Sequence, residues 1–371
     1  MRLLRTLTLL FLLFAGLDVL GQDSAAEVKL EQDGENVTVT VDGKLFTRYI
    51  TKSGTKPVLY PIIGPTGVEM TRAYPLQDAM KLEKTDHPHH RSMWFTHGDV
   101  NQVDFWTEPA EDNPKKRGFG KVVHKKFLQI ENGEHPRIVT LNEWLNSKDE
   151  KLLADYRTIE FAAEKNRRWI DFDVKLVNEG EEPVKIGDTK EGTFGIRVAA
   201  WMKVDAEKGG KIVNSLGAVD KDAWGKAASW VDYHAPNGDS TLGIAILNHP
   251  SSFRFPTYWH VRTYGLFAAN PFGVHNFLNS DDEDGSHEIK PGESIALGYR
   301  VLLHLGDEQS GRVPESFVEY AKMDKSPVEE DALVAEQPTE DPADAEESLK
   351  DPAAESSEEA ETLQPIESAA P

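Results

Sequence analysis

The sequence of 371 residues contains no cysteine. This absence excludes disulfides, thiolate zinc sites, iron–sulfur clusters and a cysteine nucleophile. A metal ion bound by this chain would have to use histidine, carboxylate or carbonyl ligands. The chemistry open to the protein is therefore that of imidazole, carboxylate, hydroxyl and cationic side chains.

Basic tracts are also missing, and the net charge is −22. Residues 324–371 hold 16 acidic residues against two lysines, a net charge of −14. Residues 1–21 carry +1, which leaves −9 for residues 22–323. An acidic body without a basic stripe lacks the electrostatic footprint of a nucleic-acid binder or of a protein that docks on anionic lipid. We therefore expect neither partner.

Long apolar runs are absent except for a short one at the amino terminus. Arg2 and Arg5 precede the apolar stretch 7–16, and Val19 and Gly21 stand at the −3 and −1 positions of a cut before Gln22. This is the layout of a secretory signal peptide, and the run is shorter than the roughly 20 residues that a spanning helix needs. We interpret residues 1–21 as a signal peptide and expect an exported protein, periplasmic or secreted, without membrane contact after cleavage.

The carboxyl-terminal segment 324–371 is built from Glu, Asp, Ala, Pro and Ser with few large apolar side chains. Such a composition cannot bury enough apolar surface to offset the entropy lost on ordering. We expect an acidic disordered tail, which leaves residues 22–323 as one folded domain.

Alternation of apolar and polar residues dominates the body. It runs through residues 37–41, 170–176, 194–198 and 295–303, and a period of two is typical of half-buried strands. Helical periodicity is scarce, and only residues 314–323 suggest a short helix. The pattern predicts an all-β fold over residues 28–305: a large antiparallel two-sheet sandwich, or supersandwich, with few short helices.

The densest group of chemically active residues lies in segment 86–106. Four of the twelve histidines fall there, at positions 87, 89, 90 and 97. Pro88 disfavours the α conformation at the preceding residue, so we expect His87 to be extended. Histidines in such a group can bind a metal, transfer protons or donate hydrogen bonds to a sugar. The same segment supplies Asp104, Trp94 and Trp106.

A second segment places Tyr258, His260, Arg262 and Tyr264 at alternate positions. As a strand, it would carry aromatic and cationic side chains on one face, which suits a binding surface better than a core or a plain solvent face. We expect this face and the histidine segment to converge on one pocket.

A candidate general base, Glu191, precedes the strand predicted at 194–198. On that strand Arg197 would lie opposite the core face, and Arg197 or Lys190 could tune the carboxylate. An exposed salt bridge is the structural alternative.

Several long motifs resemble a bacterial family labelled "methane oxygenase PmoA", and the resemblance covers most of residues 30–305. The motifs are His87-Pro-His-His-Arg-Ser-Met-Trp-Phe-Thr-His-Gly-Asp-Val-Asn101, Val103-Asp-Phe-Trp106, Lys190-Glu-Gly192, Phe255-Pro-Thr-Tyr-Trp-His-Val-Arg262 and Ala269-Asn-Pro-Phe-Gly273. The resemblance implies a galactose-mutarotase-like β-supersandwich, a fold that binds sugars on a concave sheet face.

The sequence therefore predicts an exported carbohydrate-active protein that works by acid–base chemistry as an epimerase, lyase or hydrolase, without a nucleotide cofactor. The candidate catalytic residues are His87, His90, Glu191 and His260, and the candidate sugar-binding residues are Trp94, Trp106, Asp104, Tyr258, Arg262 and Asn270.

Two alternatives remain open. One is an oxygenase or hydrolase dependent on a divalent metal, with His87, His89 and His97 as ligands. The other is a carbohydrate-binding protein without catalytic activity.

Overall fold

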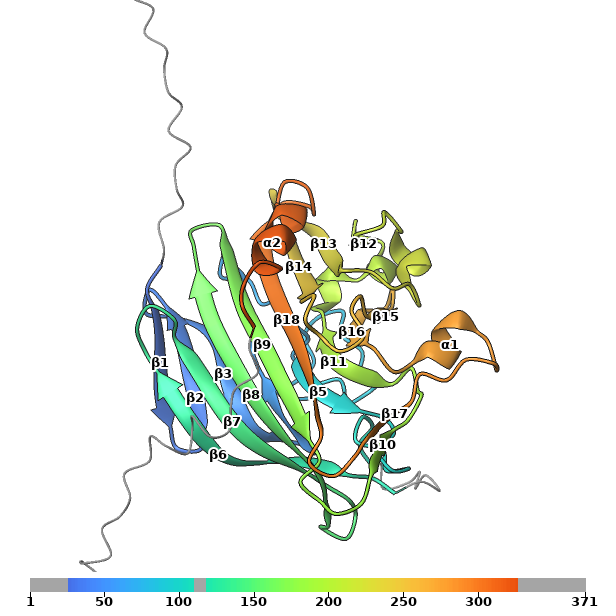
Figure 1. Ribbon diagram of the computed structural model, residues 1–371. Coiled ribbons are helices and arrows are strands. Elements are labelled where there is room, and N and C mark those ends of the chain that lie inside the picture. Colours follow the sequence, from blue (N-terminus) through green and yellow to red (C-terminus); the bar gives the residue numbers. More distant parts are fainter. Residues whose placement is uncertain (1–25, 110–117, 326–371) are drawn as a thin grey trace, which may run out of the picture. The chain divides into compact units, whose positions relative to one another are not determined.

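The computed structural model describes residues 26–109 and 118–325. Two eight-stranded sheets lie face to face, confirming the all-β prediction (Figure 1). In spatial order the first sheet holds β1 (Val28–Asp33), β2 (Asn36–Val41), β3 (Lys44–Ser53), β4 (Lys56–Leu59), β5 (Met93–His97), β11 (Gly192–Arg197), β16 (Leu266–Asn270) and β15 (Tyr258–Val261). The second holds β12 (Lys211–Asn214), β13 (Trp230–Asn237), β14 (Ser240–Asn248), β18 (Ser294–Leu305), β9 (Arg167–Val177), β8 (Lys151–Ala163), β7 (Arg137–Leu145) and β6 (Lys121–Glu131).

The remaining elements are short. A two-stranded sheet pairs β10 (Val184–Ile186) with β17 (His287–Ile289). The helices are α1 (Val274–Leu278), α2 (Val313–Tyr320) and the 3-10 turns η1 (Ala200–Met202), η2 (Val204–Ala206) and η3 (Asp220–Ala223). Helix α2 confirms the helix predicted at 314–323. No helix in the described part of the chain is long and apolar enough to cross a membrane.

The core fills the space between the two sheets. The Phe194 ring on β11 stacks on Tyr299 of β18 with 4.8 Å between ring centroids, and Phe172 of β9 lies 4.9 Å from Phe194. These inward side chains come from the alternating apolar positions of the sequence, since successive strand residues point to opposite faces. The strands predicted from alternation are therefore found as β2, β9, β11 and β18.

The central strands of the first sheet differ from its edge. In β2 buried and half-buried residues alternate, whereas every residue of β5, β11 and β16 is buried. A strand buried along its whole length is covered on both faces. The face of the first sheet that points away from the second sheet, here called the outer face, is covered by a cluster that includes Trp94, Trp106 and Leu266.

The body extends two residues beyond the predicted boundary with the acidic tail. Lys325 packs on the second sheet, where its Nζ lies 2.8 Å from Asp173 and 3.2 Å from Asp171. Arg300 also binds Asp171, at 2.6 Å, so Lys325 supplies a second cation to this pair of carboxylates on β9. The predicted signal peptide and the tail from residue 326 lie outside the described residues.

Candidate functional site

Four strands of the first sheet place one row of residues across its outer face. Gly195 of β11 pairs with Trp94 of β5 and with Ala268 of β16, and Ala268 pairs with His260 of β15. Directly paired residues point to the same face, so Trp94 and His260 share the outer face about 14 Å apart, three strand spacings. The two segments singled out in the sequence thus meet on one surface.

Four rings form a continuous stack that joins these segments. Trp94 stacks on His90 at 5.4 Å between centroids, His90 on His87 at 4.9 Å, and His87 on Tyr264 at 5.7 Å. The interplanar angles are 17°, 9° and 11°. We call Trp94, His90, His87 and Tyr264 the ring stack. It begins under the loop that covers the sheet and ends at the accessible, half-buried Tyr264.

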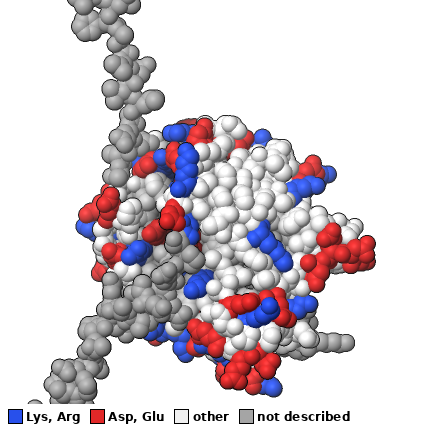
Figure 2. Space-filling view, viewed as in Figure 1, with Lys and Arg blue, Asp and Glu red and all other residues white. Residues whose placement is uncertain are grey.

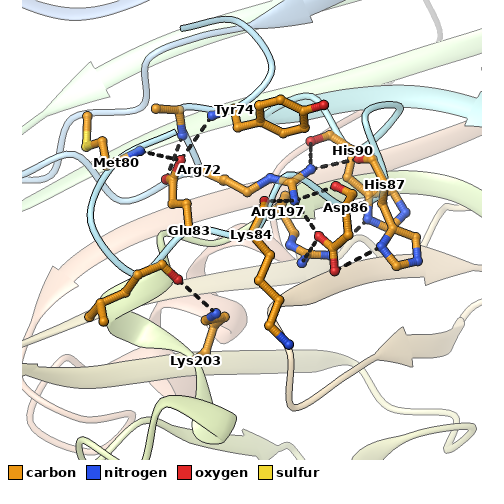
Figure 3. Close-up of polar contacts among 12 residues, drawn as sticks. Arg72, Tyr74, Met80, Glu83, Lys84, Asp86, His87, His90, Arg197 and Lys203 are labelled. Atoms are coloured by element: carbon orange, nitrogen blue, oxygen red, sulfur yellow. Dashed lines mark hydrogen bonds and ion pairs between the residues drawn. The ribbon is translucent and has the colours of Figure 1, made fainter. Parts of the chain in front are cut away.

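The histidine loop is a tight turn rather than an extended segment. His87 has a φ of 45°, so the extended conformation predicted from Pro88 is wrong. The His90 amide donates to the His87 carbonyl at 3.0 Å, which closes the turn. The Arg72 guanidinium holds it by donating to the carbonyls of His87 and His90 at 2.7 and 3.2 Å (Figure 3). A left-handed residue held by a buried arginine is the kind of local strain that functional loops store.

His90 is held as a neutral hydrogen-bond acceptor. Arg197 donates from Nη1 to His90 Nδ1 at 3.0 Å and from Nη2 to Asp86 at 3.3 Å (Figure 3). Burial, with a further contribution from His89 and Arg197, lowers the pKa of His90 well below its ordinary value. A general acid must carry its proton near the working pH. The environment therefore opposes the acid role predicted for His90.

His260 is also neutral, and its tautomer is fixed. Its Nδ1 lies 2.8 Å from the Lys190 carbonyl, which can only accept, so Nδ1 carries the hydrogen and Nε2 the lone pair. Burial lowers the pKa of His260 to about 4, and Glu191 opposes this shift. The sequence proposed His260 as an acid, but its resting state is that of a proton acceptor.

Glu191 lies close to His260 and Tyr264, as its electrostatic effect on the pKa of both side chains shows. Its carboxylate pairs with Lys190 Nζ at 2.8 Å and is one-third exposed. The salt bridge given as the structural alternative is therefore present, and the base role of Glu191 stays a prediction. Arg197, predicted as a second partner of Glu191, instead binds His90 and Asp86.

Arg262 and Tyr264 lie in a turn rather than on a strand. β15 ends at Val261, and the Gly265 amide donates to the Arg262 carbonyl at 2.9 Å. The strand face predicted for Tyr258 through Tyr264 is therefore correct only for Tyr258 and His260. The turn still carries Arg262 to the site, where its guanidinium carbon lies 5.8 Å from the Tyr264 ring centroid.

The two tryptophans predicted as sugar platforms are fully buried. Trp94 and Trp106 are 1% and 0% exposed, and their rings pack 5.0 Å apart beneath the covering loop. Gly195 makes room for them, because a Cβ at that position would lie 2.7 Å from the Trp94 ring. The indoles therefore support the ring stack from below, and the accessible platforms are the half-buried Trp224, Tyr258 and Tyr264.

Two polar residues predicted to bind sugar are occupied by their own loops. The Asp104 carboxylate accepts from the amides of Trp106 and Thr107, both at 3.0 Å, and from the Thr107 hydroxyl. Asn270 donates to the Thr189 carbonyl at 2.8 Å and accepts from the Phe272 amide at 2.9 Å. Both side chains position the site, Asp104 by fixing the Trp106 loop and Asn270 by fixing the segment before Glu191.

The three histidines predicted as metal ligands do not converge. His97 points to the opposite face of β5 from Trp94, and its Nε2 lies 2.8 Å from the Gly187 carbonyl. His87 and His89 remain neighbours, with ring centroids 5.7 Å apart. Among the described residues, the one group of three His, Asp or Glu side chains with donor atoms within 4.8 Å of one another lies on the second sheet and the loop after β18: Asp232, His234 and Glu308.

The sequence analysis missed three kinds of residue at this site. Arg72 anchors the histidine turn, and Trp224 contacts both His260, at 6.4 Å between centroids, and Arg262. The hydroxyls of the directly paired Thr96 and Thr193 are buried on the outer face without a protein partner. Trp224 lies outside every pattern of the sequence, whereas alternation with Trp94 and Arg197 could have placed the two threonines.

Comparisons with known proteins identify a family but no activity. A family model described as "Family of unknown function (DUF6807)" matches residues 36–317, and this description does not include the methane oxygenase label suggested by the motifs. No curated protein matches.

Solved structures show distant similarity. The chain is similar to the GH36 alpha-galactosidase AgaA from Geobacillus stearothermophilus, with 14% identity, a TM-score of 0.34, and coverage of 76% of this chain and 41% of that chain. It is also similar to a galactose mutarotase-like protein from Lactobacillus casei ATCC 334, with 9% identity, a TM-score of 0.37, and coverage of 75% of this chain and 100% of that chain. A galactose mutarotase-like protein from Clostridium acetobutylicum gives 10% identity, a TM-score of 0.37, and coverage of 76% of this chain and 99% of that chain.

Proposed function

The chain belongs to this family of unknown function, and we propose that it binds a carbohydrate at the accessible end of the ring stack and transfers a proton from the bound sugar to His260. One observation carries the proposal. Aromatic and ionisable side chains from separate segments gather around the buried, neutral His260. Glu191, Trp224 and Arg262 lie beside His260, and Arg262 in turn contacts Tyr264, the ring on which His87 stacks.

The mixture of side chains suits a sugar. Trp224 and Tyr264 offer partly exposed aromatic surface for the C–H face of a pyranose ring, while the exposed His87 and Arg262 offer polar groups for its hydroxyls. Specific small-molecule sites combine such apolar walls with a few fixed polar groups. The turn held by Arg72 fixes His87 in advance, which reduces the ordering cost of binding.

The proton chemistry follows from the fixed tautomer of His260. Its Nε2 lone pair can accept a proton, and the nearby Glu191 carboxylate would stabilise the imidazolium that forms. When a bound ligand excludes water, the Glu191 carboxylate stabilises the protonated His260 ring more strongly, so His260 becomes a stronger base. Proton abstraction from a sugar is the step shared by epimerases and lyases, so we favour these two reaction classes over hydrolysis.

The signal peptide expected at residues 1–21 extends this proposal to an exported protein. Mature protein collected outside the cytoplasm should begin at Gln22 when its intact mass is measured. Retention of Met1 in the collected protein would contradict export by this route.

Binding is tested with one pair of variants. Calorimetric titration with a panel of neutral and acidic oligosaccharides should give binding to the wild type and at least a tenfold loss for His87→Ala. His135→Ala is the matched control, because His135 is also exposed and also precedes a proline, in the turn between β6 and β7. Equal binding by all three proteins, or no binding by any, would contradict the proposed site.

Turnover separates binding from catalysis. His260→Gln should abolish any epimerase or lyase activity found with a sugar that binds, while it retains binding. If the wild type binds one or more of the oligosaccharides but converts none of them to an altered product, proton transfer is refuted and the protein is a carbohydrate-binding protein.

A further inference from the structure

Building on the proposed function, we infer that the sugar carries a carboxylate and that Arg262 receives it, so that the ligand class is the uronates. Arg262 is exposed, and no carboxylate of the described residues lies within ion-pair distance of its guanidinium. The other arginines of the site are paired: Arg72 and Arg197 bind Asp86, and Arg91 binds Glu108. Arg262 is thus the arginine of the site that is available to a ligand.

The guanidinium of Arg262 is held in place without being neutralised. Its carbon lies 5.9 Å from the Trp224 ring centroid and 5.8 Å from that of Tyr264. The backbone is fixed as well, because the Arg262 amide donates to the Leu266 carbonyl at 2.8 Å. Aromatic contacts orient a guanidinium and leave its N–H donors free, whereas a carboxylate partner would occupy them.

Further cations lie near Arg262 although the whole chain is strongly negative: the Arg197 guanidinium carbon lies 4.7 Å from the ring centroid of Tyr264, which Arg262 also contacts. Arg72, Arg197, Lys84 and Lys203 gather beside the histidine turn (Figure 3). Burial and then the charges of Arg197 and Lys84 lower the pKa of Lys203, which shows how closely the cations lie.

The acids of this region do not compensate these cations fully. Asp86 is shared by two arginines, the Glu83 carboxylate accepts from the amides of Ala73, Tyr74 and Met80, and Asp205 lies near Lys203, so three acids face these four cations and Arg262, while Glu191 is paired with Lys190. Elsewhere, one face of the body shows acidic and basic side chains interspersed in small groups around a broad uncharged area (Figure 2). In residues 22–323, which carry a net charge of −9, a local excess of cations favours an anionic ligand.

A carboxylate fits this arrangement better than other anions do. Arginine binds a planar carboxylate through two parallel N–H donors, and a uronate holds its carboxylate next to the ring that Tyr264 and Trp224 would contact. Sulfate esters share the negative charge but are tetrahedral and can be attached at several positions of the ring. The experiment therefore includes them as a separate arm.

The test compares each acid with its own methyl ester. Trisaccharides of glucuronate, galacturonate, mannuronate and guluronate, their methyl esters and a sulfated galactose trisaccharide are titrated into the full mature chain. We expect at least one acid to bind the wild type at least tenfold more tightly than its ester. Arg262→Met should remove that preference, and Arg262→Lys should keep part of it. Arg48→Met is the matched control, since Arg48 is exposed on β3, five strands from β15.

The outcomes separate this inference from the proposed function. If acids and esters bind the wild type equally well and His87→Ala weakens both, the sugar site stands and the uronate assignment falls. The assignment also falls if Arg262→Met keeps the tenfold preference, or if only the sulfated trisaccharide binds. If no saccharide binds, both proposals fail. Should Arg262→Met misfold, the acid–ester comparison on the wild type and on Arg262→Lys still decides.

Discussion

The neutral state of His260 makes a quantitative prediction about acid stability. Its pKa is about 4 in the folded protein because the ring is buried, and about 6.5 when the chain is unfolded. When the pH falls below about 6.5, the unfolded chain takes up a proton that folded His260 refuses, so the free energy of unfolding decreases until about pH 4. This difference in pKa corresponds to about 3 kcal/mol of stability, most of which is lost by about pH 4.5.

The perturbation that isolates this contribution is His260→Gln, which keeps a polar side chain and removes the titrating ring. Urea unfolding at about pH 7.5 and about pH 4.5 gives the loss of stability for each protein. We expect the loss to be smaller in His260→Gln than in wild type by about 2–3 kcal/mol. His135→Gln, at an exposed position, should behave like wild type. Equal losses in His260→Gln and wild type would refute the assignment of a buried, neutral His260.

Two further predictions concern packing. Gly195→Ala should destabilise the protein by about 1–3 kcal/mol in urea unfolding, because the new methyl group would lie 2.7 Å from the Trp94 ring. Gly118→Ala is the control: a Cβ there has its nearest neighbour atom at 3.6 Å, so the substitution should cost less than about 0.5 kcal/mol. Equal destabilisation by the two substitutions would contradict the tight contact at Gly195. A chain that ends at Lys325 should melt within about a degree or two of the full chain. One that ends at Met323 should melt about 2–4 °C lower, because Asp173 loses its cation while Asp171 keeps Arg300. Equal melting temperatures of the two truncated chains would show that Lys325 contributes nothing.

Alternation made the sheets predictable, because a strand with one face on the core and the other on solvent carries its burial pattern in the sequence. β2 and most of β9 follow this rule, whereas β18 is buried at nearly every position although its sequence alternates. Alternation also placed His260 on the face of a strand, but it could not pair that strand with the one that carries Trp94. β5 and β15 become neighbours in the site through β11 and β16, which lie far from β5 in the sequence.

The burial of Trp94 and Trp106 could not be read from the sequence for a different reason. A tryptophan on the outer face of a sheet is an exposed platform or a covered core residue depending on where a distant loop lies. Here the loop folds over the sheet, and Arg72 fixes its turn through three backbone carbonyls, those of Asp86, His87 and His90. The same buried environment depresses the pKa of His90, which is why a histidine that looks like an acid in the sequence is a neutral acceptor in the fold.

The central claim is that a sugar binds at the accessible end of the ring stack, and a crystal structure of the protein with a bound oligosaccharide tests it most directly. The account predicts a pyranose ring in van der Waals contact, at about 4 Å, with Tyr264 or Trp224, and a polar group of the sugar within hydrogen-bond distance of Arg262. A sugar bound at the second sheet, or anywhere out of contact with His87, Trp224 and Tyr264, would contradict it.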